Sequence, residues 1–124
     1  MWNSDLLNYD YVGAPWPNQW VNRVGCGGFS LRSRKLLEAS ATLPYIKSGK
    51  SKEDDNEDYY MCVTMYEHMI NSGIKFAPVN LAREFCVEHP IPENPHKYND
   101  ISTYKSFAFH GIFNSGGMDY INRI

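Results

Sequence analysis

The sequence lacks long apolar runs, paired cysteines and an excess of basic charge, and each absence excludes a class of protein. No apolar run is long enough to cross a bilayer, and residues 1–5 have neither the basic nor the apolar region of a signal peptide. The three cysteines, Cys26, Cys62 and Cys86, are odd in number and widely spaced, so they indicate neither a disulfide framework nor a zinc site. The net charge is −2 without a basic stripe, which gives a nucleic-acid partner no electrostatic support. We therefore expect a soluble, cytoplasmic protein with neither a membrane nor a nucleic acid as its partner.

The composition is that of an ordinary globular protein with many aromatic residues. The 124 residues, 43% of them hydrophobic and 21% charged, suffice for one modest core, so we expect a single domain over residues 1–124. Aromatic residues make up 15% of the chain, among them nine Tyr and three Trp. Tyr and Trp line many sugar sites because they combine a flat apolar face with a polar edge, but a tyrosine-rich core would give the same composition.

Turn residues and hydrophobic periodicity predict an α/β fold, a mixed small sheet with two main helices and no regular βαβ alternation. We expect short strands at residues 9–14, 76–78, 82–87 and 107–111, and a further strand that begins at Phe29.

The two helices are expected over residues 34–41 and from Glu57 to about residue 71. Ser33 or Ser30 is a suitable N-cap for the first helix. Its buried side is expected to carry Leu36, Leu37 and Leu43.

Prolines and charged residues predict the loops. Pro15 and Pro17 lack a backbone donor, so residues 15–20 should form an ordered loop that exposes the edges of Trp16 and Trp20. Further loops are expected at residues 47–58 and 89–99, and one helical turn from Met118.

A glycine-rich stretch is the first candidate for a functional element. Gly25, Gly27 and Gly28 fall within four positions, which predicts a tight turn rather than a regular element. Adjacent glycines would let backbone amides reach a ligand such as a sugar hydroxyl or a phosphate oxygen. A purely structural turn is the alternative.

The acidic pair Glu57-Asp58 is the second candidate. It stands where a charged loop becomes an amphipathic helix, so its carboxylates can point into a cleft from a rigid element, as a general base requires. A solvated acidic loop would carry the same residues.

His110, in the aromatic segment 107–111, is the third candidate. A histidine on such a strand can be a packed core residue, or a metal ligand if carboxylates from elsewhere in the chain join it.

Five motifs, in this order, resemble a poorly characterised family of glycosyltransferase-like proteins that is usually described as a domain of unknown function. The motifs are YDYVGAPW (9–16), VGCGGFSLRSRKLL (24–37), NEDYYMC (56–62), FAPVNLAREFCVE (76–88) and FAFHG (107–111). The resemblance implies the C-terminal, acceptor-side half of a GT-A fold. It also implies transfer of a sugar from a nucleotide-sugar to a glycan or other hydroxyl acceptor, with Mn²⁺ or Mg²⁺ as cofactor.

The same resemblance implies roles for individual residues. Asp58 would be the catalytic base and Glu57 would bind an acceptor hydroxyl, or these two roles would be exchanged. His110 would be a metal ligand. The residues implied in substrate binding are Trp16, Gly27, Gly28, Ser30 and Arg32.

The sequence departs from the family pattern at two points. Cys26 stands where a polar residue, typically Asn, is usual. Only eight residues precede Tyr9, where a nucleotide-binding half with an Asp-x-Asp motif is expected, and Asp5 is not in such a context. We therefore expect a fragment that is inactive alone and forms a homo-oligomer. Alternatives are a catalytically dead carbohydrate-binding remnant that stacks Trp16 and Trp20 on sugar rings, and a purely structural interaction domain.

Overall fold

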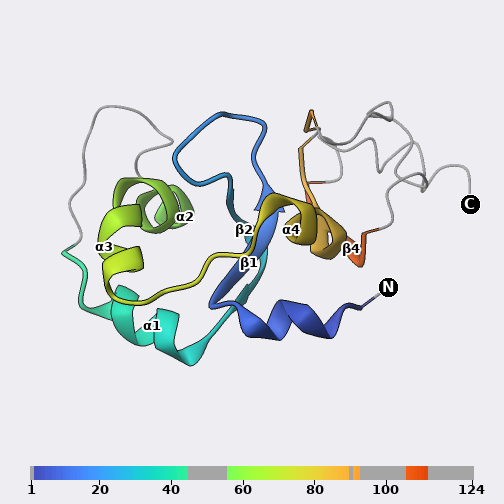
Figure 1. Cartoon of the computed structure of the whole chain (residues 1–124). Coiled ribbons are helices and arrows are strands. Elements are labelled where there is room, and N and C mark those ends of the chain that lie inside the picture. Colours follow the sequence, from blue (N-terminus) through green and yellow to red (C-terminus); the bar gives the residue numbers. More distant parts are fainter. Residues whose placement is uncertain (1, 45–55, 90, 93–105, 112–124) are drawn as a thin grey trace, which may run out of the picture.

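The computed structural model describes residues 2–44, 56–89, 91–92 and 106–111, and within these ranges the chain is a mixed α/β protein (Figure 1). Its elements are η1 (Ser4–Asn8), β1 (Tyr11–Pro15), β2 (Val24–Arg32), α1 (Arg34–Ala41), α2 (Glu57–Tyr59), η2 (Tyr60–Thr64), α3 (Tyr66–Asn71), α4 (Val79–Phe85), β3 (Cys86–Val87) and β4 (Ala108–Phe109). The strands form two separate two-stranded sheets, β1-β2 and β3-β4. Most of the loops expected at 47–58 and 89–99, and the turn from Met118, lie outside the described residues, while residues 57 and 58 belong to α2.

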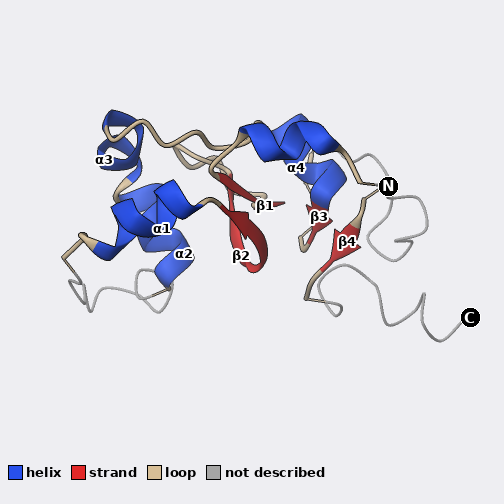
Figure 2. Ribbon diagram, turned by 90° about the horizontal axis from the view of Figure 1, so that it is seen from below, coloured by secondary structure: helices blue, strands red, loops and turns tan. Residues whose placement is uncertain are grey.

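The β1–β2 pair stands between two groups of elements. Figures 1 and 2 place α1, α2 and α3 on one side of it and α4, β3 and β4 on the other. A core of buried residues, among them Tyr11, Leu36, Met69 and Phe85, joins the two sides. Within the described ranges, none of the helices has the length and apolar character needed to cross a membrane.

The glycine-rich stretch lies inside a strand, so the prediction of a tight turn with a strand starting at Phe29 is wrong. β2 pairs with β1 antiparallel, and Gly13 faces Ser30 while the next residue, Ala14, faces Cys26. The three intervening residues, 27–29, therefore bulge out of the ladder, which locally twists and re-aims a strand. Pro15 also belongs to the pairing rather than to the loop, since its missing donor is tolerated at the last position of an edge strand.

The first helix begins as predicted. Ser33 is the N-cap, because its side chain accepts a hydrogen bond from the Leu36 amide. Leu36 is buried and Leu43 is partly buried against the core. Leu37 is 51% exposed, so its predicted burial is wrong. One helical face of eight residues is too narrow to bury two adjacent leucines.

The helix expected from Glu57 to about residue 71 is interrupted. α2 continues directly into the π-helical segment η2, and a break at Met65 precedes α3. The Met65 amide reaches back five residues to the Tyr60 carbonyl, at 2.9 Å. Such π-bulges shift the side chains that follow them and are frequent near functional sites.

The strand expected at 82–87 is instead a helix followed by a two-residue strand. Pro78 precedes α4 in an extended conformation, and Ala82 and Phe85 are buried three positions apart, as on one face of a helix. Only Cys86 and Val87 pair, in parallel with Ala108 and Phe109, so the strand predicted at 107–111 exists in shortened form. In the segment expected to be a strand at 76–78, Phe76 makes only an isolated bridge to Tyr11.

Candidate functional site

A pocket of about 300 Å³ opens where three segments meet. The β1–β2 connection contributes residues 16–18 and 20, the start of α2 contributes Asn56, Asp58 and Tyr59, and the residues after β3 contribute Glu88 and His89. A pocket of this size is at the lower end of those that bind small molecules. Its lining combines aromatic rings with two carboxylates and an imidazole, so it could take a polar ligand that also presents an apolar face.

Three aromatic rings form one wall of the pocket. The Trp16 and Trp20 rings meet edge to face with centroids 5.0 Å apart, and Trp20 meets Tyr59 in the same way at 4.9 Å. Trp16 is only 8% exposed, so the prediction that both tryptophans present exposed edges is wrong for this residue. Trp20 and Tyr59 remain half-buried and are the rings that a ligand could contact.

The Trp16 ring is buried because it packs against the backbone of Gly25, which has no side chain. A Cβ placed on Gly25 would lie 2.2 Å from two carbons of that ring. Asn22, a buried polar residue that the sequence analysis did not single out, holds the connection in place. Its side-chain amide donates to the carbonyls of Val24 and Cys62, at 3.2 and 3.1 Å.

Asp58 is fixed at the pocket by the glycine-rich strand. The Gly27 amide donates to the Asp58 carboxylate at 2.9 Å, and a Cβ on Gly27 would lie 3.0 Å from the Asp58 Cβ. The glycines therefore do allow a close backbone approach, but the partner at Gly27 is the protein's own carboxylate. Asp58 is half-buried, and its position at the pocket wall is that of a group able to accept a proton from a bound hydroxyl.

Glu57 turns away from the pocket lining and is held by Arg32. The Arg32 guanidinium donates to the Glu57 carboxylate at 2.7 Å, and its Nε donates to the Ser30 hydroxyl at 3.0 Å. The same guanidinium lies 5.5 Å from the centre of the Tyr11 ring, a cation–π distance. Ser30 donates in turn to the Gly27 carbonyl. In this structure Ser30 and Arg32 thus brace the segment that holds Asp58, and neither lines the pocket.

His110 lies against the other glycine of the bulge. A Cβ on Gly28 would lie 2.1 Å from the His110 ring, so only glycine leaves room for this histidine. The His110 Nδ1 is 3.4 Å from one Glu88 carboxylate oxygen. The three predicted elements, Gly27-Gly28, Glu57-Asp58 and His110, therefore lie together on one side of the molecule.

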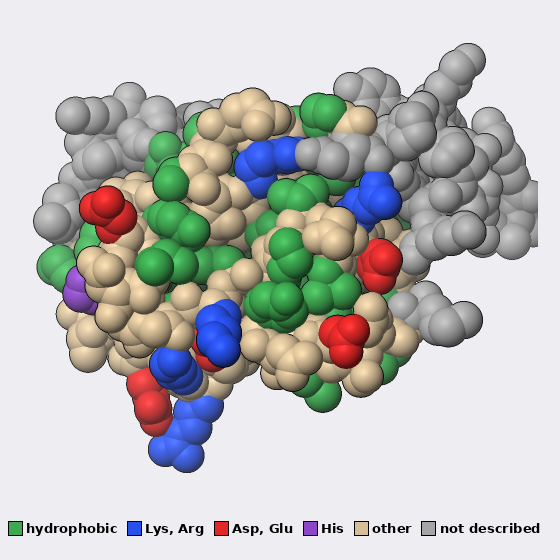
Figure 3. All heavy atoms as spheres, in the orientation of Figure 1, with side chains coloured by type: hydrophobic (Ala, Val, Ile, Leu, Met, Phe, Trp, Pro, Cys, Tyr) green, Lys and Arg blue, Asp and Glu red, His purple; other side chains and the backbone are tan. Residues whose placement is uncertain are grey.

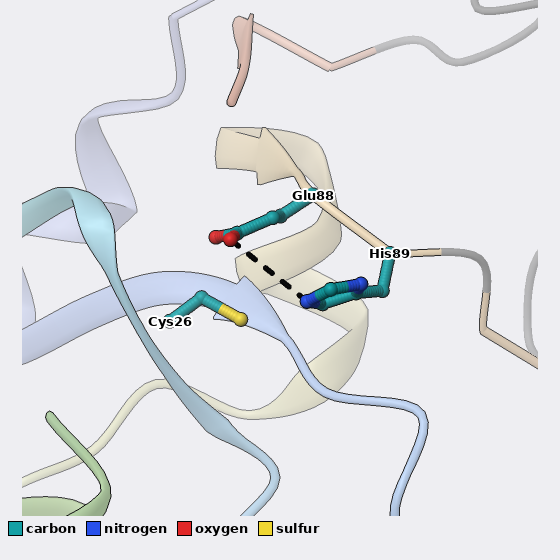
Figure 4. A group of neighbouring side chains, drawn as sticks. All are labelled: Cys26, Glu88 and His89. Carbon is teal, nitrogen blue, oxygen red and sulfur yellow. Dashed lines mark ion pairs between the residues drawn. The ribbon is translucent and has the colours of Figure 1, made fainter. Parts of the chain in front are cut away.

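Glu88 and His89 are site residues that the sequence analysis missed. Figure 4 shows their side chains converging with that of Cys26, and all three offer a ligand atom within 4.8 Å of the others. Burial raises the pKa of the Cys26 thiol above its ordinary value, and the nearby Glu88 carboxylate raises it further. The signal for this group in the sequence is weak, since it consists of a Glu-His pair directly before Pro90, far along the chain from Cys26.

Comparison with known proteins gives a family but no activity. Residues 3–110 match a family described as "Protein of unknown function (DUF5672)". No curated protein and no solved structure matches the chain. The matched range includes the aromatic wall, Asp58, Glu88 and His110, and it covers most of the sequence. The chain therefore belongs to the DUF5672 family.

Proposed function

We propose that this chain forms the acceptor side of a site that transfers a sugar from a nucleotide-sugar to a hydroxyl group. The observation that carries the proposal is the Asp58 carboxylate, held by the Gly27 amide at 2.9 Å on the wall of a pocket lined by aromatic rings. Apolar ring faces suit the C–H faces of a sugar, and a fixed carboxylate suits its hydroxyl groups.

In the proposed reaction Asp58 accepts the proton of the acceptor hydroxyl. The acceptor oxygen forms a bond to the anomeric carbon of the donor sugar as the bond from that carbon to the phosphate oxygen breaks. The nucleoside diphosphate leaves with the bonding electron pair. The Gly27 amide orients the Asp58 carboxylate, and Arg32 holds the neighbouring Glu57. A positioned general base of this kind contributes about 10²- to 10⁴-fold to a rate.

The cofactor expected from the resemblance is Mn²⁺ or Mg²⁺. The His110 imidazole and the Glu88 carboxylate lie 3.4 Å apart, but only the carboxylate is the type of ligand that such an ion prefers, so this pair alone fits the ion poorly. When bound, the ion would neutralise charge on the leaving diphosphate.

A binding module without transfer is the second candidate. The half-buried rings of Trp20 and Tyr59, which meet edge to face, favour it, because such rings bind sugars without any catalytic group. The two candidates differ in their requirement for a nucleotide and a metal.

The test measures binding of a panel of UDP-, GDP- and ADP-sugars to the full chain by calorimetry, with and without Mn²⁺, and release of nucleoside diphosphate in the presence of sugar acceptors. We expect Mn²⁺-dependent binding by the chain. Turnover is expected only once a nucleotide-binding half is joined to it, and Asp58→Asn should then lower that turnover at least about 100-fold. Asp5→Asn, an exposed aspartate on η1, is the matched control. Metal-independent binding of free glycans without nucleotide-sugar binding favours the second candidate, and wild-type turnover in Asp58→Asn removes this residue from the mechanism.

A further inference from the structure

Three potential metal ligands from two distant parts of the sequence meet beside the pocket. Cys26 comes from the middle of the β1–β2 pairing and is 2% exposed, whereas Glu88 and His89 directly follow β3. The Glu88 side chain is 17% exposed and that of His89 is 33% exposed. Figure 4 shows the thiol, the carboxylate and the imidazole pointing toward one another.

The three groups are spaced so that one ion could lie between their ligand atoms. His89 Nε2 lies 3.8 Å from Glu88 Oε1, beyond hydrogen-bonding distance. All three ligand atoms lie within 4.8 Å of one another. Ligand atoms around a tetrahedral zinc ion lie roughly 3.5 Å apart, so small rotations of the partly exposed Glu88 and His89 side chains would complete the geometry.

We propose that Cys26, Glu88 and His89 bind a zinc ion. The donor set selects the metal, because a thiolate with an imidazole favours zinc over Mg²⁺ or Mn²⁺, which prefer oxygen ligands. On binding, the ion replaces the thiol proton of Cys26, which is released to solvent. Three protein ligands leave one coordination position, and since Glu88 and His89 line the pocket, that position opens toward it.

The surroundings also supply an orienting partner for the carboxylate. His110 Nδ1 lies 3.4 Å from Glu88 Oε2, whereas the other oxygen, Oε1, is the one nearer to His89. Outer partners of this kind fix ligand orientation in metal sites. The assignment does not depend on the proposed sugar transfer, because it concerns binding of zinc alone, with Glu88 as a ligand of zinc and His110 as the outer partner of Glu88.

The test is equilibrium binding of Zn²⁺ to the full chain, prepared metal-free and reduced, together with the absorption spectrum of its Co²⁺ form. We expect one zinc ion per chain and a thiolate-to-cobalt charge-transfer band. His89→Gln should weaken zinc binding at least about 100-fold, more than loss of an outer partner typically costs. Cys26→Ser should remove the charge-transfer band.

Matched controls separate ligand loss from loss of folding. His68→Gln changes an exposed histidine on α3, and Cys62→Ala changes a buried cysteine outside the group. Both should bind zinc as the wild type does, and circular dichroism melting checks that every variant is folded. Because His89 is partly exposed, His89→Gln is informative even if Cys26→Ser does not fold. Wild-type zinc affinity in folded His89→Gln, or a cobalt spectrum without thiolate ligation, would overturn the assignment.

Discussion

Residue 25 has to be glycine because an aromatic ring occupies the place of its side chain. A Cβ at this position would lie 2.2 Å from the Trp16 ring and 2.9 Å from the Cys62 Cβ. Both neighbours are buried, so neither can move into solvent without opening the core. We predict that Gly25→Ala destabilises the protein by about 1–3 kcal/mol, the usual cost of overpacking a core, measured as the free energy of unfolding in urea.

A double-mutant cycle tests the cause of that loss. Trp16→Leu removes the ring that the added methyl group would meet, so Gly25→Ala should cost less in that background. An equal cost in both backgrounds would show that the ring contact is not the reason for glycine.

At the scale of single residues, the sequence predicted that the glycines allow close contacts, but not which residues make those contacts. Gly27 and Gly28 were predicted to allow close approach, and they do, with Asp58 and His110 as their close neighbours. Cys26 could not be assigned to a group with Glu88 and His89, because only the folding of β3 next to the first sheet brings them together. Spacing along the chain carries no information on such a contact.

At the scale of elements, one serine connects the first helix to the first strand. The Ser33 hydroxyl accepts from the Leu36 amide at 3.0 Å and donates to the Asp10 carboxylate at 2.6 Å. Burial alone would raise the pKa of Asp10, but the Ser33 hydroxyl and the Lys75 amide donate to its carboxylate, and together with nearby lysines they hold the pKa below its ordinary value. The depressed pKa means that Asp10 contributes stability above its unfolded-state pKa and loses it as the pH falls through the folded one.

We therefore predict that Ser33→Ala lowers the free energy of unfolding by about 1–2 kcal/mol at pH 7, through loss of the cap and of the bond to Asp10. As the pH falls from about 4 through the depressed pKa of folded Asp10, the difference from wild type should shrink toward the contribution of the cap alone, because Asp10 becomes protonated in both proteins. The measurement is urea unfolding across pH 3–7. Ser40→Ala, which removes a hydroxyl near the other end of α1, is the control. A difference that stays constant with pH would contradict the role of Asp10.

Elements with a clear end signal were predictable, and those decided by tertiary contacts were not. Ser33 marks the start of α1 in the sequence because an N-cap acts locally. The segment 79–87 contains both α4 and β3, and over so few residues its apolar pattern fits either periodicity. The π-helical segment η2 has no local sequence signal of its own, so a continuous helix was the natural prediction.

At the scale of the whole molecule, the mixed α/β class was predictable, whereas the division of its strands was not. Instead of the single small sheet that was expected, the strands form two separate pairs. Between Pro78 and β3, where part of a strand was expected, the chain forms the helix α4. Pairing partners depend on which strand edges meet in space. The strands of a parallel pair such as β3–β4 are not joined by a hairpin turn, so the sequence carries no turn signal that would predict the pair.

The expected homo-oligomer stays a prediction, and the structure suggests where its interface lies. Trp2 and Phe107, 43% and 48% exposed, meet edge to face at 5.5 Å, and Phe107 stacks on Phe85 of α4 at 6.4 Å. Phe29 also stacks on Phe85, at 5.2 Å. Figure 3 shows hydrophobic side chains gathered over α4 with charged groups around them. Exposed aromatic residues that cluster in this way are typical of protein interfaces.

We predict that the chain is a dimer by light scattering at micromolar concentration and that the double substitution Trp2→Ala, Phe107→Ser weakens the dimer at least tenfold. Aromatic rings contribute most to interfaces of this kind, and both side chains are exposed enough to be replaced without emptying the core. Val21→Ser, Leu37→Ser is the matched control, because these two exposed side chains lie in the β1–β2 connection and on α1, away from the aromatic cluster. A monomeric wild type would remove the prediction, and equal weakening in both double variants would place the interface elsewhere.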